Sequence, residues 1–161
     1  FVDNGFSAIR FNFRGVGKSE GIYDDGEGEL SDAASVLDWL QQYNTNSKIC
    51  WVAGFSFGAW VAMQLLMRRP EINGFISVSP PANIRDFSFL APCPSSGLII
   101  HGDKDNIASY DSSKILAEKL QKQKKVDIKF KQVKGADHFY QNYTEEFSNV
   151  VDSYIKDSLK S

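Results

Sequence analysis

Cysteine and histidine are both scarce in this 161-residue sequence, which contains two of each. Cys50 and Cys93 are too few to make a disulfide framework, and no cluster of cysteine and histidine indicates a structural zinc site. Cys50 lies inside an apolar run, so we expect it to be a small buried hydrophobic residue. The sequence implies no metal ion and no organic cofactor.

The sequence also lacks an excess of positive charge and long hydrophobic runs. A formal net charge of -2 gives no electrostatic basis for binding nucleic acid or an anionic membrane. No apolar run approaches the ~20 residues that a membrane span requires. No signal segment is visible, so we expect a cytoplasmic protein in which the glycosylation sequon at Asn142 arises by chance. The length suits one domain over residues 1–161.

The stretch from 48 to 66, KICWVAGFSFGAWVAMQLL, carries the most informative pattern. An apolar run leads into a Gly-x-Ser-x-Gly turn, and apolar residues at helical spacing follow it. Strand, tight turn and helix is the context in which this pentapeptide presents a nucleophilic serine. Ser56 must accept strained backbone angles, and Gly54 and Gly58 let the chain pass closely on both sides. A buried turn with serine as a helix cap is the alternative, but the flanking patterns favour a nucleophile.

Strand and helix patterns alternate along the whole chain. The expected strands cover residues 7–13, 49–53, 72–78, 97–100 and 126–133. The expected helices cover residues 30–40, 59–66, 111–123 and 144–155. This alternation is typical of an α/β fold, with a doubly wound, mostly parallel sheet that carries helices on both faces. We interpret the acidic run at 24–29 as the solvated entrance of the helix that follows it.

Three candidate catalytic residues, Ser56, Asp105 and His138, fall in this order after the ends of three of the expected strands. In such a sheet, functional groups gather beyond the carboxyl ends of the strands. A serine hydroxyl needs a base within hydrogen-bond reach and a third group that fixes the tautomer of the base. His138 can be that base, and Asp105 can orient it.

Two of these assignments have competitors in the sequence. His101 ends its expected strand, and we interpret it as a structural or supporting group, which leaves His138 as the base. Asp103 competes with Asp105, which lies two residues farther past the strand and is better placed to curl over the sheet edge. Asp137 is interpreted as a turn former.

The residues around Ser56 and His138 suggest how a substrate would be held. The backbone N–H of Phe57 is the expected first donor of an oxyanion hole. The second donor normally comes from a loop after an earlier strand, and we find no such loop in this sequence. Phe55, Phe139 and Tyr140 are candidates for an apolar pocket that binds the acyl group, although each could equally belong to the core.

Together these motifs resemble the α/β-hydrolase superfamily, and in particular small, nearly lidless bacterial hydrolases. The matching stretches are Arg10–Gly21, Ala53–Gly58, Ser77–Pro81, His101–Asp105 and Gly135–Phe139. The resemblance implies Ser56 as nucleophile, Asp105 as acid and His138 as base. One departure is Ile107-Ala108-Ser109, where relatives often have Val-Val-Pro after the acid.

The resemblance also implies a reaction and an arrangement of the chain. It implies a serine hydrolase that cleaves an ester or related acyl bond of a small-molecule substrate through an acyl-enzyme. Members of the superfamily carry three strands and most of a helix before the position of Phe1, and one of these strands inserts between the 7–13 strand and the nucleophile strand. We therefore hypothesise that the sequence is a fragment of a longer polypeptide.

Two rival functions compete with this interpretation. Gly17-Lys18-Ser19 follows an expected strand, but a phosphate-binding P-loop needs glycine where Asn12 stands, and the dinucleotide fingerprint fails at Glu20. A catalytically inactive α/β-hydrolase-like binding domain is the second rival. The missing oxyanion donor favours it, whereas the intact Ser56, Asp105 and His138 argue against it.

Overall fold

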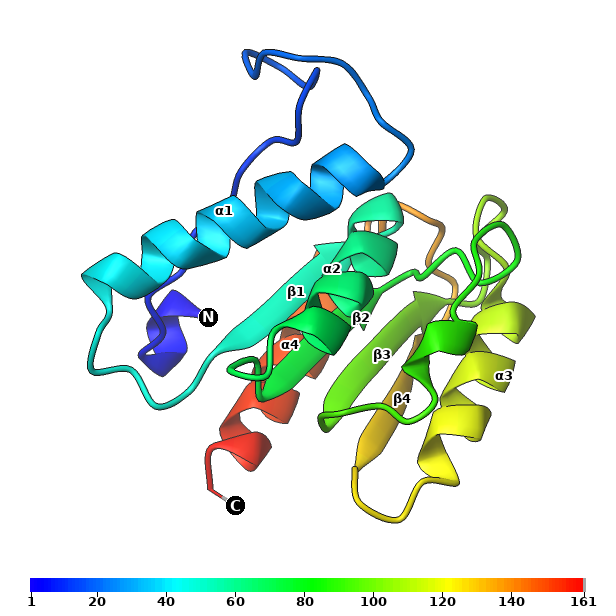
Figure 1. Ribbon diagram of the computed structural model, residues 1–161. Coiled ribbons are helices and arrows are strands. Elements are labelled where there is room, and N and C mark those ends of the chain that lie inside the picture. Colours follow the sequence, from blue (N-terminus) through cyan, green and yellow to red (C-terminus); the bar gives the residue numbers. More distant parts are fainter. Residues whose placement is uncertain (161) are drawn as a thin grey trace.

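A four-stranded parallel sheet forms the centre of the computed structural model, which describes residues 1–160 (Figure 1). The strands are β1 (Trp51–Phe55), β2 (Gly74–Val78), β3 (Gly97–Gly102) and β4 (Ile128–Val133), in the spatial order β1-β2-β3-β4. The main helices are α1 (Glu27–Tyr43), α2 (Phe57–Arg68), α3 (Tyr110–Gln121) and α4 (Thr144–Ser158). Short 3₁₀ helices cover Val2–Asn4 and Ser88–Leu90. The predicted α/β fold with a parallel sheet is confirmed.

Helices cover both faces of this sheet, and the central strands are buried on both sides. Phe75 and Ile99 pack with α1, α2 and α3 on one face, whereas their neighbours Ile76 and Ile100 pack with α4 on the other. Figure 1 shows α4 behind the sheet and α2 and α3 in front of it. Parallel strands that are covered on both faces need apolar residues at successive positions. This is why β2 and β3 appear in the sequence as continuous apolar runs.

Residues 7–13 form no strand, so the prediction of a strand there is wrong in this structure. Residues 7–12 are exposed, and a cavity of about 1240 Å³, lined by Ile9 and Ala53 among others, lies between this segment and β1. A strand is stable where its N–H and C=O groups pair with a neighbouring ladder. Within residues 1–160, β1 pairs with β2 alone. Strand propensity without such a partner leaves residues 7–13 as irregular chain.

The acidic run at 24–29, which covers the start of α1, is only partly solvated, and this corrects the expectation of an exposed helix entrance. Asp24, Asp25 and Glu27 are exposed, but Glu29 has 1% of its surface exposed. Its carboxylate accepts hydrogen bonds from the backbone N–H groups of Gly26 at 2.8 Å and Asp24 at 2.9 Å. Burial alone would raise the pKa of Glu29, but these backbone hydrogen bonds hold it below its ordinary value. Glu29 therefore acts as the acidic member of a helix-capping arrangement.

Replacing Glu29 by glutamine should lower the free energy of unfolding by about 1–3 kcal/mol at neutral pH, because the amide leaves a buried backbone donor unpaired. Since folding lowers the pKa of Glu29, its stabilising effect is complete above the pKa of the unfolded carboxyl. The effect is lost as the pH falls through the folded pKa. The difference between wild type and Glu29→Gln in urea unfolding should therefore shrink in acid.

Glu27→Gln is the matched control, because it removes the same charge from an exposed position in the same helical turn. Its effect should stay below about 0.5 kcal/mol. Equal losses in the two variants would contradict the capping role of Glu29.

Candidate active site

A strained turn places Ser56 between β1, which ends at Phe55, and α2, which begins at Phe57. Ser56 has φ 53° and ψ −120°, a combination that costs a residue with a side chain about 1–3 kcal/mol. The turn is supported on both sides. The Ser56 N–H donates to the carbonyl of Val78 at 2.8 Å, and the Ser56 carbonyl accepts from the N–H of Ala59 at 2.9 Å. The sheet and the helix thus hold the serine in its strained conformation.

The two glycines of the pentapeptide, Gly54 and Gly58, differ in how much space surrounds them. A Cβ atom on Gly54 would collide with the backbone of Gly58 and Ala59, so strand and helix approach each other within backbone contact at this point. A Cβ atom on Gly58 would find only the ring of Phe13, at an ordinary contact distance of 3.9 Å. The expectation that both glycines are needed is therefore correct for Gly54 and wrong for Gly58.

Ser56, His138 and Asp105 lie in one hydrogen-bonded row beyond the carboxyl end of the sheet. His138 Nε2 is 3.0 Å from Ser56 Oγ, and His138 Nδ1 is 2.6 Å from Asp105 Oδ2. Asp137 supports the turn that presents His138, because its carboxylate accepts the N–H of Phe139 at 3.1 Å. Figure 1 shows this segment, in orange, beside the start of α2. Nδ1 must carry the proton that points to the carboxylate, which leaves Nε2 free to accept from the serine hydroxyl.

The carboxylate of Asp105 is completely shielded from solvent. Its Oδ1 accepts the backbone N–H groups of Ile107 at 2.9 Å and Ala108 at 2.8 Å, and its Oδ2 faces His138. Burial alone would raise the pKa of Asp105, but the hydrogen bonds from His138 and the two N–H groups hold it below its ordinary value. Asp105 is therefore ionised at neutral pH.

The competing residues of the sequence analysis lie outside this row. Asp103 accepts hydrogen bonds from Gln132 Nε2 at 2.9 Å and from the N–H of Gly135 at 2.5 Å, so it fixes the turn after β4. His101 is fully buried behind Asp105 and does not face Ser56; its Nε2 lies 3.1 Å from Asp105 Oδ2.

The aromatic residues expected to hold substrate divide into two groups. The rings of Phe55 and Phe139 lie 4.9 and 5.1 Å from the imidazole of His138, and they are 41% and 61% exposed. Tyr140 instead turns into the core on the α4 face, where its hydroxyl lies 2.9 Å from Ser79 Oγ. Burial raises the pKa of Tyr140 to about 12. The expectation that Tyr140 lines the pocket is wrong in this structure, because its buried hydroxyl finds its partners inside the core.

Phe57 occupies the first position of α2, directly after Ser56. The first N–H groups of a helix have no partner inside the helix. The Phe57 N–H is therefore available beside Ser56, and the partial positive charge of the helix N-terminus favours an anion there.

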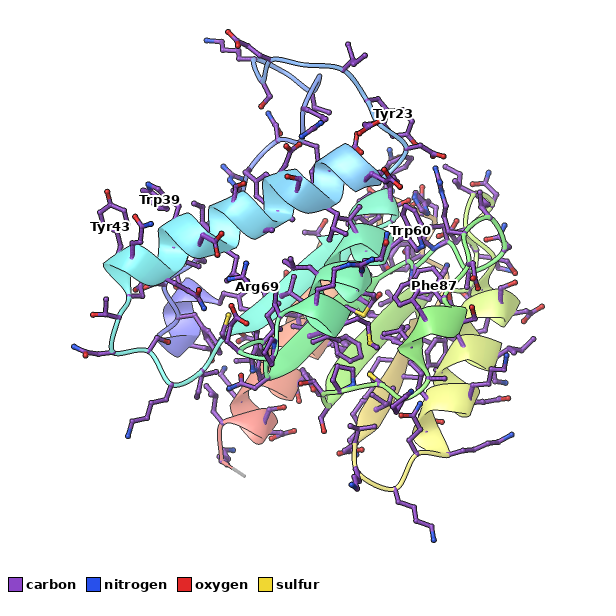
Figure 2. The ribbon with its side chains drawn as sticks, in the orientation of Figure 1. Tyr23, Trp39, Tyr43, Trp60, Arg69 and Phe87 are labelled. Carbon is purple, nitrogen blue, oxygen red and sulfur yellow. The ribbon has the colours of Figure 1, made fainter. Side chains whose placement is uncertain are left out.

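Sequence reasoning missed Arg85, which joins three segments next to the start of α2. Its guanidinium lies over the rings of Phe57 and Trp60, with distances of 5.6 and 4.7 Å to the ring centroids, and pairs with Asp25 at 2.7 Å. Arg85 also donates to the hydroxyl of Tyr23 at 2.8 Å. Figure 2 shows Tyr23 and Trp60 toward the same end of the molecule. These partners lie about 25 to 60 positions away from Arg85 in the sequence, so no local sequence pattern predicts the contacts.

Neither a metal site nor a phosphate loop is apparent in residues 1–160. No group of three or more histidine, cysteine, aspartate or glutamate side chains in this range is placed to hold a metal ion. Gly17-Lys18-Ser19 does not lead directly into a helix, since α1 begins at Glu27. None of the helices in the same range is long and apolar enough to cross a membrane.

Comparison with known proteins connects this geometry to hydrolases. The sequence model of the family described as X-Pro dipeptidyl-peptidase (S15 family) matches residues 1–155. An uncharacterized protein of Rickettsia prowazekii (strain Madrid E) is 53% identical over 158 residues. The match covers 96% of this chain and 66% of that protein, so the chain spans slightly less than two thirds of this curated relative.

Two solved structures resemble the fold closely. A protein of unknown function from Agrobacterium tumefaciens, described as a candidate alpha/beta hydrolase, is 53% identical with a TM-score of 0.95. The match covers 98% of this chain and 72% of that one. A serine hydrolase without a lid from Xanthomonas campestris is 31% identical with a TM-score of 0.80, and the match covers 91% of this chain and 64% of that one.

The strained turn makes a prediction that separates its two glycines. Gly54→Ala should lower the free energy of unfolding by about 2–4 kcal/mol, because the added methyl group meets backbone that cannot move away easily. Gly58→Ala should leave stability unchanged or raise it by up to about 1 kcal/mol, because alanine is the better helix former. Thermal unfolding of the two variants measures the difference, and similar losses in both would contradict this description of the turn.

Proposed function

Because this chain belongs to the X-Pro dipeptidyl-peptidase (S15) family and has the fold of the α/β-hydrolases, we propose that it is a serine hydrolase with Ser56, His138 and Asp105 as its catalytic triad. The observation that carries the proposal is the continuous row of hydrogen bonds from serine to imidazole to carboxylate, with distances of 3.0 and 2.6 Å. The order of the three residues along the chain is also that of the α/β-hydrolases.

In the proposed reaction, Ser56 Oγ attacks the carbonyl carbon of the substrate while His138 Nε2 takes the hydroxyl proton. The negative oxygen that forms accepts a hydrogen bond from the Phe57 N–H at the start of α2. His138 then gives its proton to the leaving group, which departs and leaves an acyl-enzyme. Water repeats the sequence, with His138 again as base, and releases the acid. Throughout, the Asp105 carboxylate stabilises the charged imidazole.

The substrate class proposed for this site is an ester or related acyl bond with an apolar group beside the scissile bond. The exposed rings of Phe55 and Phe139 flank His138 and support this choice, since they give apolar surface to a group bound next to Ser56. Cleavage of the peptide bond that follows an X-Pro dipeptide is a second candidate, favoured by the family match. Rates on p-nitrophenyl esters and on X-Pro p-nitroanilides, measured side by side, distinguish the two.

Ser56→Ala should lower the turnover of p-nitrophenyl butyrate by about four orders of magnitude or more, because no other group supplies the nucleophile. Circular dichroism should show an unchanged fold. Ser153→Ala, the same chemical change on an exposed position of α4, is the control and should keep full activity. Unchanged turnover in Ser56→Ala would refute the mechanism. Ligand binding without turnover in the wild type would support an inactive binding domain instead.

Phe139→Ala should raise KM for esters with a long or aromatic acyl group by about tenfold, as expected for losing contact with one aromatic ring. KM for the acetate ester should change much less, because a methyl group covers little of the ring. Tyr140→Phe is the neighbouring control, since its side chain lies in the core and not at the site. Equal KM changes for short and long acyl groups in Phe139→Ala would contradict the proposed contact.

A further inference from the structure

Two imidazoles share a single oxygen of Asp105. His138 Nδ1 lies 2.6 Å from Oδ2 on the side that faces Ser56, and His101 Nε2 lies 3.1 Å from the same atom on the buried side. The side chain of His101 has no solvent exposure. The proposed reaction uses His138 and Asp105, but it assigns no role to the more deeply buried His101.

The neighbours of His101 determine which of its nitrogens carries the proton. Nε2 lies 3.1 Å from Asp105 Oδ2 and also 3.1 Å from the carbonyl oxygen of Ala108. Both of these oxygens are acceptors, so Nε2 carries the hydrogen and donates it. Nδ1 is buried and has no hydrogen-bond partner within residues 1–160. A proton on Nδ1 would therefore place an unpaired charge in a dry environment, which is costly.

The surroundings keep His101 neutral. The titratable groups that face it are Asp105 in the loop after β3, His138 in the loop after β4, and Tyr110 at the start of α3, whose ring lies 6.0 Å away edge-on. Burial lowers the pKa of His101 and outweighs the opposite influence of Ala108 and Asp105. Burial also raises the pKa of Tyr110, so this phenol stays protonated.

From this arrangement we infer that His101 is a positioning residue of the site, a permanently neutral Nε2–H donor that fixes the Asp105 carboxylate for His138. Without it, the backbone N–H groups of Ile107 and Ala108 would still hold Oδ1, but within residues 1–160 Oδ2 would keep His138 as its one donor. The donated hydrogen bond has two effects. It restricts rotation of the carboxylate, and it withdraws negative charge from the oxygen that stabilises the imidazolium.

These two effects make separate predictions for catalysis, and both rest on the proposed function. A freely rotating carboxylate orients His138 less well, which lowers kcat. A carboxylate oxygen with one donor fewer is a stronger acceptor for the imidazolium of His138. A higher pH is then needed to remove the proton that His138 must lose before it can act as the base. Loss of the His101 donor should therefore lower kcat and move the acidic limb of the kcat/KM profile to higher pH.

The kinetic test compares His101→Leu with His101→Gln. Leucine fills much of the space but has no donor, whereas the glutamine Nε2 lies as many bonds from the backbone as the histidine Nε2. His101→Leu should lower kcat by about tenfold or more with little change in KM, the size expected for losing a hydrogen bond to a charged group. Its acidic limb should move to higher pH, and His101→Gln should keep most of the activity and the wild-type profile. Equal losses in both variants with unmoved pH profiles would overturn the inference.

A spectroscopic test decides the protonation state without any turnover. The chain has two histidines, so long-range ¹H–¹⁵N spectra contain two imidazoles, and His101→Gln assigns them. His101 should show the neutral Nε2–H form at every pH at which the protein stays folded. An Nδ1–H form, or conversion to the charged form within that range, would overturn the inference even if the leucine variant fails to fold. If the wild type hydrolyses neither the p-nitrophenyl esters nor the X-Pro p-nitroanilides, the proposed function fails, while this spectrum still decides the protonation state of His101.

Discussion

Asp105 places a carboxylate with no solvent exposure beyond the carboxyl end of β3. Removing an ionised carboxylate from water costs several kcal/mol unless hydrogen bonds replace the lost hydration. Here the backbone N–H groups of Ile107 and Ala108, together with the rings of His138 and His101, supply that replacement. The loop after β3 must wrap around the carboxylate, and the turn after β4 must approach it. Satisfying one buried charge thus brings the base to its position.

The parallel sheet brings the three proposed catalytic residues to one edge. All four strands run in the same direction, so Ser56, Asp105 and His138, which follow β1, β3 and β4, emerge at the same edge of the sheet. The strain at Ser56 is tolerated because the next strand and the next helix both hydrogen-bond to its backbone. The close approach at Gly54 makes this arrangement possible. Local strain, sheet register and the buried charge depend on one another, and the proposed chemistry needs all three.

Features that depend on nearby residues could be predicted from the sequence, and features that depend on distant ones could not. The turn at Ser56 and most helices and strands follow from local spacing and agree with the structure within a few residues. The prediction of a strand over residues 7–13 was wrong because a segment with strand propensity forms a strand only beside another strand with which it can pair. The predictions that Glu29 is exposed and that Tyr140 lines the pocket were wrong, because the burial of a residue depends on the distant segments that pack over it. In the case of Tyr140, adjacent aromatic residues can also point to opposite sides of the chain. Arg85 was missed because its partners come from two other parts of the chain.

The central claim is that the hydrogen-bonded row activates the hydroxyl of Ser56. The most direct test is the intact mass of the protein after exposure to a fluorophosphonate, followed by peptide mapping of the adduct. The account predicts one adduct per chain, located on Ser56 and absent when the protein is denatured before exposure. A folded protein that gains no mass, or that is labelled on another residue while Ser56 stays free, would contradict it.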